Sequence, residues 1–208
     1  MTARGESLRE AQRPTRSLVT PKQTLTIGHW NVRTMYRGGA AAQIAREMEG
    51  YQLDILGISE CRWMGAGRMR LASGQTVLYS GDEELHEGGV AIIISQQAEK
   101  SLMEWTPISK RIITARFYTR YRRVTVLQAY APHNEREEEE KDQFYLELQE
   151  TLDECNKNDI IIIMGDLNAK VGSDNSGYER TMGVHGLGTQ NENRERLCTS
   201  NQRNVVSP

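Results

Sequence analysis

The stretch DIIIIMGDLNAK, from Asp159 to Lys170, carries the strongest structural signal in the sequence. Four isoleucines and a methionine follow Asp159 without interruption, and polar residues bound the run. A continuous apolar run of this length is typical of a strand that is buried on both faces. If the chain stays extended beyond the run, Asp166 and Asn168 leave on the same face, because the side chains of a strand alternate.

The end of this predicted strand combines a glycine, a carboxylate and an amide, namely Gly165, Asp166 and Asn168. A carboxylate only accepts hydrogen bonds, whereas an amide donates and accepts, so the pair can orient a water molecule and contact a phosphate. The alternative is a polar turn that caps a core strand, since Asp and Asn are common turn residues. The stretch alone leaves both interpretations open.

Length and composition predict one domain, or one domain with a tail, for these 208 residues. Hydrophobic residues make up 38% of the chain and charged residues 26%, which is enough for a core. The formal net charge of −2 argues against a protein that binds polyanions over its whole surface. Any contact with nucleic acid must therefore be local.

Targeting signals and cysteine usage predict an intracellular protein, nuclear or cytoplasmic, that does not enter a membrane. No segment approaches the roughly twenty consecutive apolar residues that a membrane span needs. The N-terminus lacks the apolar region of a secretory signal. Cys61, Cys155 and Cys198 are odd in number and show no CxxC spacing, which favours reduced thiols over a zinc site.

Residues 1–23 are predicted to be a disordered basic tail, and residues 24–208 to be the folded domain. The tail holds five basic and two acidic residues, and Pro14 and Pro21 interrupt what little periodicity it has. A short arm that binds polyanions is the alternative interpretation of this tail.

Hydrophobic periodicity predicts an α/β protein, because strands and helices alternate in the first part of the chain. Alternation or buried runs predict strands at Thr24–Trp30, Asp54–Ser59, Thr76–Ser80, Gly89–Ser95, Arg111–Tyr118 and Arg123–Tyr130. Helices are predicted at Gly38–Gly50, with its apolar face formed by Ala40, Ala41, Ile44, Ala45 and Met48, and at Glu135–Asn156, with a buried stripe of Phe144, Leu148 and Leu152. Ser173–Gly188 is predicted to be a loop and Asn191–Asn201 a short charged helix.

Polar residues stand at the carboxyl ends of four predicted strands: Asn31, Glu60, Tyr130, and Asp166 with Asn168. If these ends converge, they form a cleft with two carboxylates, two amides and a phenol. Oxygen ligands without thiolates suit a hard cation such as Mg²⁺ that is shared with a substrate phosphate. The metal would stabilise charge on the reacting phosphate, and the second carboxylate could activate water.

Four short motifs carry a family resemblance: HWNVRT around Asn31, ISECRW around Glu60, LQAYAPH around Tyr130 and MGDLNAK around Asp166. Together and in this order they resemble the endonuclease/exonuclease/phosphatase superfamily, and most of all the abasic-endonuclease-like domain of non-LTR retrotransposons. The resemblance covers about residues 24–204. It implies a four-layer sandwich of two β-sheets flanked by helices.

The resemblance also implies a role for each motif residue. Glu60 would be the principal Mg²⁺ ligand, and Asn31 would support the metal. Tyr130 would contact the scissile phosphate, Asp166 would orient or deprotonate the attacking water, and Asn168 would bind a phosphate oxygen. The partner would be DNA, with RNA as an alternative. The product would be a nick with a 3′-hydroxyl, which a retroelement uses as a primer for reverse transcription.

The sequence departs from the family pattern near its end. The family continues beyond a segment like Asn193–Val206 into further strands that end in Ser-Asp-His. None of the four histidines here stands in that context, and His185 lies in a glycine-rich loop where a solvated role is expected. These observations predict a domain that is truncated at its C-terminus, with an incomplete second sheet.

Three functions therefore stay open at the level of sequence. The first is a Mg²⁺-dependent phosphodiesterase acting on DNA. The second is an inactive retroelement remnant or a domesticated binding module, which the missing Ser-Asp-His favours. The third is a phosphatase of the same superfamily. The arginines 116, 120, 122 and 123 favour a polyanionic ligand, or form a solvated strand face. The sequence leaves the oligomeric state open.

Overall fold

The computed structural model describes residues 10–11, 13–19, 24–170, 172–174, 176–179, 191, 193–194 and 196–197. The chain divides into two compact units, Met1–Tyr130 with Cys155–Gly165 and Ala131–Glu154 with Asp166–Pro208. Most of the predicted loop Ser173–Gly188, including His185, lies outside the described residues. No helix in the described part of the chain is long and apolar enough to cross a membrane.

The first sheet has the strand order β2-β3-β6-β5-β4, with β2 at Ile27–Asn31, β3 at Ile55–Ser59, β6 at Val90–Ile94, β5 at Thr76–Ser80 and β4 at Ala66–Arg70. Strands β2 and β3 run parallel, and the other neighbours run antiparallel. The parallel pair needs a crossover, which helix α1, Ala40–Gly50, supplies. The predicted strand–helix–strand order is confirmed, and the structure shows in addition that the two strands pair in parallel.

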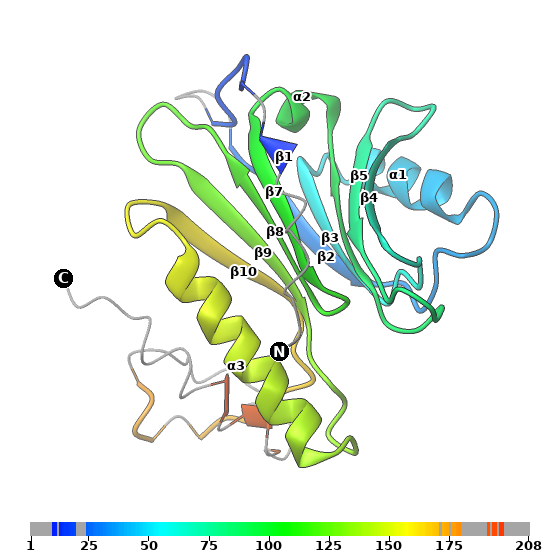
Figure 1. Cartoon of the computed structure of the whole chain (residues 1–208). Coiled ribbons are helices and arrows are strands. Elements are labelled where there is room, and N and C mark those ends of the chain that lie inside the picture. The colour runs from blue at the N-terminus through cyan, green and yellow to red at the C-terminus, as the bar shows by residue number, and fades with distance from the viewer. Residues whose placement is uncertain are drawn as a thin grey trace, which may run out of the picture. The chain divides into compact units, whose positions relative to one another are not determined.

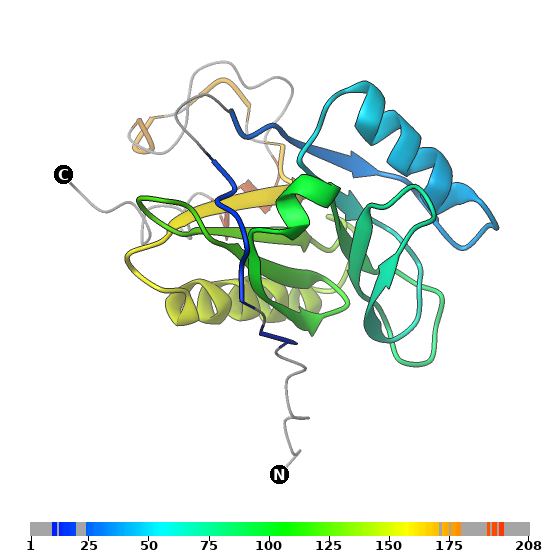
Figure 2. The same cartoon turned by 90° about the horizontal axis from the view of Figure 1, so that it is seen from above.

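Helix α1 covers one face of this sheet (Figures 1 and 2). Ala45 and Met48 are buried, and Ala41 and Ile44 pack at the margin of the same apolar cluster. The cluster also contains Leu56, Ile58, Val77, Ala91 and Ile93 of the sheet. The helix begins after Gly39, whose positive φ of 85° suits a residue without Cβ. The predicted apolar stripe therefore contacts the sheet as amphipathic helices do.

The second sheet has the order β1-β7-β8-β9-β10, with β1 at Glu10–Ala11, β7 at Leu102–Ser109, β8 at Ile112–Phe117, β9 at Val124–Tyr130 and β10 at Ile160–Asp166. It packs against the first sheet through a large buried cluster that includes Leu78, Ile92, Phe117 and Val126. Burying one such side chain contributes about 1.5–3 kcal/mol. The predicted α/β fold with two β-sheets is confirmed.

Strand β10 is confirmed, but its predicted burial on both faces is wrong. Ile160 and Ile161 are 47% and 37% exposed, and the remaining residues of the strand are half-buried. Among the described strands β10 stands at the end of its sheet and has one neighbour, β9. An apolar run in sequence cannot distinguish a central strand from one at the end of a sheet.

Gly165 of β10 lies close against the backbone of β9. Its φ is 146°, and a Cβ at this position would overlap the backbone carbonyl oxygen of Ala129. We expect Gly165→Ala to lower the free energy of unfolding by about 3 kcal/mol, because neither the backbone conformation nor the strand spacing accommodates a methyl group. Urea unfolding followed by circular dichroism measures this change.

Gly50→Ala is the matched control, because a Cβ at Gly50 meets no atom within 4 Å and the residue ends helix α1. This variant should be as stable as the unsubstituted chain or slightly more stable. Equal effects of the two substitutions would show that β10 does not require glycine at position 165.

Besides β1, which lies in the predicted tail, two strands of the described chain were not predicted. Strand β4 is polar and partly exposed, and β7 contains Glu104 and Pro107 within its span. Proline cannot donate to a β-ladder, and the ladder between β7 and β8 shifts its register beside Pro107. Neither strand has the apolar run or regular alternation on which strand prediction depends.

The described part of the predicted tail differs from a disordered segment. Strand β1 pairs antiparallel with β7, and Leu18 is only 7% exposed within the core between the sheets. The amides of Thr15 and Leu18 donate to the carbonyl oxygens of Lys100 and Tyr118. Residues 13–19 are therefore part of the folded unit. The remaining residues of the predicted tail, apart from 10–11, lie outside the described residues.

The second unit contains helix α3, Glu138–Glu154. Phe144, Leu148 and Leu152 are buried, as the i, i+4, i+8 spacing predicted. Lys141 is also buried, at 1% exposure, although it follows three glutamates at the start of the helix. Its Nζ donates to the Asn134 carbonyl oxygen and forms an ion pair with Glu138. Sequence alone gives no sign that one lysine of a charged helix is buried.

The described residues 193–194 and 196–197 are helical, in agreement with the predicted short helix at Asn191–Asn201. Arg196 joins this segment to helix α3, because its guanidinium forms ion pairs with Asp142 and Glu138. The other residues of the predicted helix are described only at Asn191.

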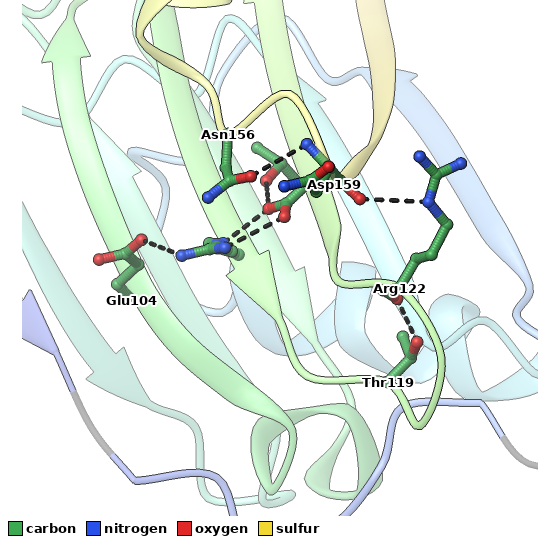
Figure 3. Close-up of polar contacts among 8 residues, drawn as sticks. Glu104, Thr119, Arg122, Asn156 and Asp159 are labelled. Atoms are coloured by element: carbon green, nitrogen blue, oxygen red, sulfur yellow. Dashed lines mark hydrogen bonds and ion pairs between the residues drawn. The ribbon is translucent and has the colours of Figure 1, made fainter.

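The basic cluster is largely occupied by structural contacts. Arg116 donates two hydrogen bonds to the carboxylate of Asp159, at 2.6 and 3.0 Å, and a further one to Glu104 at 3.3 Å. Arg122 donates to the Asn158 carbonyl oxygen, and the Arg123 guanidinium lies over the Tyr118 ring. Figure 3 shows Glu104 and Asp159 in this group of contacts. The prediction of a polyanion site therefore does not hold for Arg116.

Candidate active site

The first sheet brings the ends of several strands into one row. The register pairs Asn31 with Ser59, Ser59 with Val90, and Val90 with Ser80. Since β2 and β3 run parallel, Asn31 ends β2 beside the last residue of β3, and Glu60 follows directly. The amide nitrogen of Asn31 donates to Glu60 Oε1 at 2.8 Å. The sheet therefore brings together two of the five predicted site residues.

Glu60 accepts hydrogen bonds from three side chains. Besides Asn31, the Arg62 guanidinium donates to Glu60 Oε2 at 3.2 Å, and Tyr130 donates as well. Burial by itself raises the pKa of Glu60, but these hydrogen bonds together outweigh it and lower the pKa below its ordinary value. Glu60 is therefore an ionised carboxylate at neutral pH.

The backbone at Glu60 is in the left-handed region, with φ of 58°, as is Arg62 with φ of 56°. Side chains other than glycine rarely adopt this region, and such strain is concentrated at functional sites. The conformation lets the chain turn sharply after β3 while Cys61 and Arg62 donate backbone hydrogen bonds to Gly89 and Gly88. The loop that carries Glu60 is thus fixed by the loop before β6.

Tyr130 is the third predicted site residue in this group. It ends β9, is 5% exposed, and reaches Glu60 with its hydroxyl. The Arg111 guanidinium lies 5.3 Å from the centre of its ring and donates to its carbonyl oxygen at 3.1 Å. Arg62 and Arg111 were not predicted as site residues. The sequence signal for Arg62 was its place two residues after Glu60.

A polar cluster of half-buried His29 with Ser59 and Gln128 lies next to this site. His29 Nε2 is 3.0 Å from Ser59 Oγ, and the Gln128 amide nitrogen donates to the same hydroxyl at 3.1 Å. Ser59 and Gln128 are fully buried. A Cβ at Gly57 would overlap the Gln128 side chain, so glycine there makes room for it. This cluster supports the residue that precedes Glu60.

Asp166 and Asn168 form contacts within the second unit. Asp166 Oδ1 accepts from the backbone N–H of Asn168 at 3.2 Å, which makes an Asx turn. Asn168 has φ of 48°, so the chain is not extended there and the condition for two side chains on one face is not met. The Asn168 amide donates to the Ala131 carbonyl oxygen at 2.7 Å, and its oxygen lies 3.2 Å from His133 Nδ1. Asp166 and Asn168 therefore form the polar turn that was the alternative interpretation of this stretch.

The residues around Glu60 fit a hard divalent cation in donor chemistry. Glu60 supplies an ionised oxygen ligand, and Asn31 supplies an amide beside it. Among the described residues no group of three or more His, Cys, Asp or Glu side chains is placed to hold a metal ion. Mg²⁺ commonly takes one or two protein ligands and keeps several water or substrate oxygens, so a site of this composition fits its chemistry.

Cys61 follows the candidate metal ligand but is chemically protected. The side chain is fully buried, and burial raises the pKa of the thiol to about 11. We expect iodoacetamide to label Cys61 far more slowly than half-buried Cys155 in the folded chain, as peptide mass spectrometry would show. Unfolding in urea should equalise the two rates, and fast labelling of Cys61 in the folded chain would contradict its burial.

The raised pKa of Cys61 also predicts how the free energy of unfolding changes at alkaline pH. Above about pH 9 the unfolded chain loses the Cys61 proton while the folded chain keeps it, until the pH passes about 11. The folded state then binds more protons, so the free energy of unfolding falls as the pH rises through this interval.

Comparison with known proteins agrees with the family resemblance and the fold. The chain is 38% identical over 176 residues to craniofacial development protein 2 of Bos taurus, which covers 85% of this chain and 29% of the relative. The same protein of Tragulus javanicus is 37% identical over 176 residues, covering 85% and 30%. The chain thus spans about 30% of the length of these curated relatives.

Solved structures agree in fold. The endonuclease domain of TRAS1, a telomere-specific non-LTR retrotransposon, superposes with a TM-score of 0.53 at 16% identity, covering 86% of this chain and 70% of that domain. The AP endonuclease LMAP from Leishmania major gives a TM-score of 0.55 at 14% identity, covering 84% and 65%. At these identities the likeness concerns the fold alone.

The fold and the site define an α/β protein with two packed sheets and a carboxylate held by an amide and a phenol at the ends of its strands. The sequence model of the Endonuclease/Exonuclease/phosphatase family matches residues 28–202. The chain belongs to this family.

Proposed function

We propose that the chain is a Mg²⁺-dependent phosphodiesterase that hydrolyses DNA backbone bonds and derives from a retroelement endonuclease. The observation that carries the proposal is the Glu60 carboxylate, ionised and held in place by Asn31, Arg62 and Tyr130. Preorganised charges of this kind contribute to catalysis because they need no rearrangement when charge develops on the substrate.

In this proposal each residue near Glu60 has one task. Glu60 and Asn31 hold the cation, which would neutralise charge on the reacting phosphate. Tyr130 directs its hydroxyl toward Glu60 and thus toward the phosphate bound there. The Arg62 guanidinium, paired with one carboxylate oxygen, adds positive charge where an anionic substrate would approach.

Asp166 and Asn168 are proposed to orient the attacking water and to bind a phosphate oxygen. Their support is the family resemblance of the MGDLNAK motif. The hydrogen bonds that Asn168 makes to Ala131 and His133 fix its side chain and suit a positioning task. Asp166→Asn should reduce hydrolysis about 100-fold or more, if this carboxylate is the general base.

The test is nicking of supercoiled plasmid and of a duplex with one abasic site, in Mg²⁺ and in EDTA. Incision that requires Mg²⁺ and yields a 3′-hydroxyl end supports the proposal. Hydrolysis of small phosphomonoesters without nicking would instead identify a phosphatase. A folded chain that binds DNA but cleaves neither substrate would leave a binding module or an inactive remnant.

A further inference from the structure

Two aromatic rings meet on the loops next to the candidate site. Tyr36 belongs to the loop between β2 and α1, and His86 belongs to the loop between β5 and β6. Their ring centres are 4.2 Å apart with an interplanar angle of 51°. Tyr36 is 64% exposed, so the pair presents an aromatic surface to solvent. We call Tyr36 and His86 the aromatic platform.

Hydrogen bonds connect the platform to Glu60 through one residue. His86 Nδ1 lies 2.9 Å from the carbonyl oxygen of Arg62, and because a carbonyl only accepts, Nδ1 carries the proton. The Arg62 guanidinium in turn donates to Glu60 Oε2, and its side chain is 45% exposed. Two consecutive hydrogen bonds therefore connect the His86 ring to Arg62, and Arg62 to the candidate metal ligand Glu60.

The platform is held in place before any ligand arrives. Trp63 Nε1 donates to the Met35 carbonyl oxygen at 3.0 Å, next to Tyr36 in sequence. The amides of Glu84 and Leu85 both donate to Asp82 Oδ1, and Lys110 Nζ donates to Asp82 Oδ2 at 2.7 Å. These bonds fix the loop that carries His86. A fixed platform binds a ligand with less loss of conformational entropy than a mobile one.

An exposed ring beside a guanidinium matches the two parts of a nucleotide. Aromatic side chains stack on nucleobases of any sequence, and a guanidinium binds phosphate oxygens through paired hydrogen bonds. A base inside a duplex already stacks on both sides, so the platform suits an unpaired base. We propose that Tyr36, supported by His86, stacks on an unpaired nucleobase of a DNA strand while Arg62 binds a phosphate of the same strand.

This inference rests on the proposed phosphodiesterase function and specifies its substrate class, a single-stranded or locally unpaired strand. The test is fluorescence anisotropy with a labelled single strand of about twelve nucleotides, in EDTA so that binding is measured without hydrolysis. Tyr36→Ala should weaken binding about tenfold, whereas Tyr36→Trp should retain the affinity. An abasic strand of equal length, which keeps the phosphates, should bind the unsubstituted chain and Tyr36→Ala equally weakly.

Tyr121→Ala is the matched control, because Tyr121 is 77% exposed on the loop between β8 and β9. This variant should bind the single strand as the unsubstituted chain does. Unchanged affinity of Tyr36→Ala, equal losses in both variants, or no binding by the unsubstituted chain would overturn the inference. Plasmid nicking is scored separately, so a chain that nicks without using Tyr36 loses only this inference. A chain that binds through Tyr36 and never nicks loses only the hydrolytic function.

Discussion

Replacing Glu60 by glutamine is expected to reduce Mg²⁺-dependent nicking about 100- to 1000-fold. The substitution keeps the size of the side chain and its contact with Asn31 but removes the negative charge that would hold the cation. The effect should be large because Glu60 is the carboxylate that the Asn31, Arg62 and Tyr130 hydrogen bonds converge on. Initial rates of supercoiled plasmid loss, measured at several Mg²⁺ concentrations, give the reduction.

Two further variants distinguish the effect of the Glu60 charge on the nicking rate from the effects of its neighbours and of charge elsewhere. Asn31→Ala removes a neighbour and should cost about 10- to 100-fold, with part of the rate recovered at high Mg²⁺. Glu83→Gln makes the same chemical change on an exposed glutamate of the loop between β5 and β6 and should leave the rate unchanged. If Glu60→Gln and Glu83→Gln nick equally well, Glu60 does not hold the metal.

The sequence predicted the strand ends that carry the candidate residues better than it predicted the contacts between those residues. Strand β5 has the predicted bounds, and Asn31, Glu60 and Tyr130 lie at strand ends as expected. The alternation of side chains and the polar residues after each run are local signals, so they are visible in one sequence. The convergence of Asn31 and Glu60 depends on the parallel register of β2 and β3, which no local pattern specifies.

Other features depend on contacts between distant segments. Glu60 and Arg62 both adopt left-handed backbone conformations although neither is glycine, in a turn held by hydrogen bonds from Cys61 and Arg62 to the loop before β6. Asn168 was expected to continue an extended strand, but its positive φ and its bond to Ala131 place it in a turn. The apolar run of β10 predicted the strand correctly and its burial wrongly, because burial depends on how many neighbours the sheet supplies.

Asp159 is expected to give the largest stability change of any single substitution considered for this chain. Its side chain is 1% exposed, and it accepts two hydrogen bonds from Arg116 and one from Thr125 at 2.9 Å (Figure 3). Hydrogen bonding to Asp159 raises the pKa of Arg116. Asp159→Ala should lower the free energy of unfolding by about 3–5 kcal/mol, because it leaves the Arg116 guanidinium half-buried without its main partner.

The stability lost in Asp159→Ala should come from the Arg116 charge that is left without a partner, and not from the net contribution of the ion pair to folding. A double variant, Asp159→Leu with Arg116→Met, replaces both charges by apolar groups and should recover most of the stability. Glu104→Gln is the control, since Glu104 contacts the same guanidinium with a side chain that is 25% exposed, and it should cost less than about 1 kcal/mol. Urea unfolding of the unsubstituted chain and of these three variants measures the stability changes, and adding the single variants Asp159→Leu and Arg116→Met completes the cycle that gives the coupling energy. A double variant no more stable than Asp159→Ala would mean that the ion pair is needed in its own right, to attach the start of β10 to strands β8 and β9.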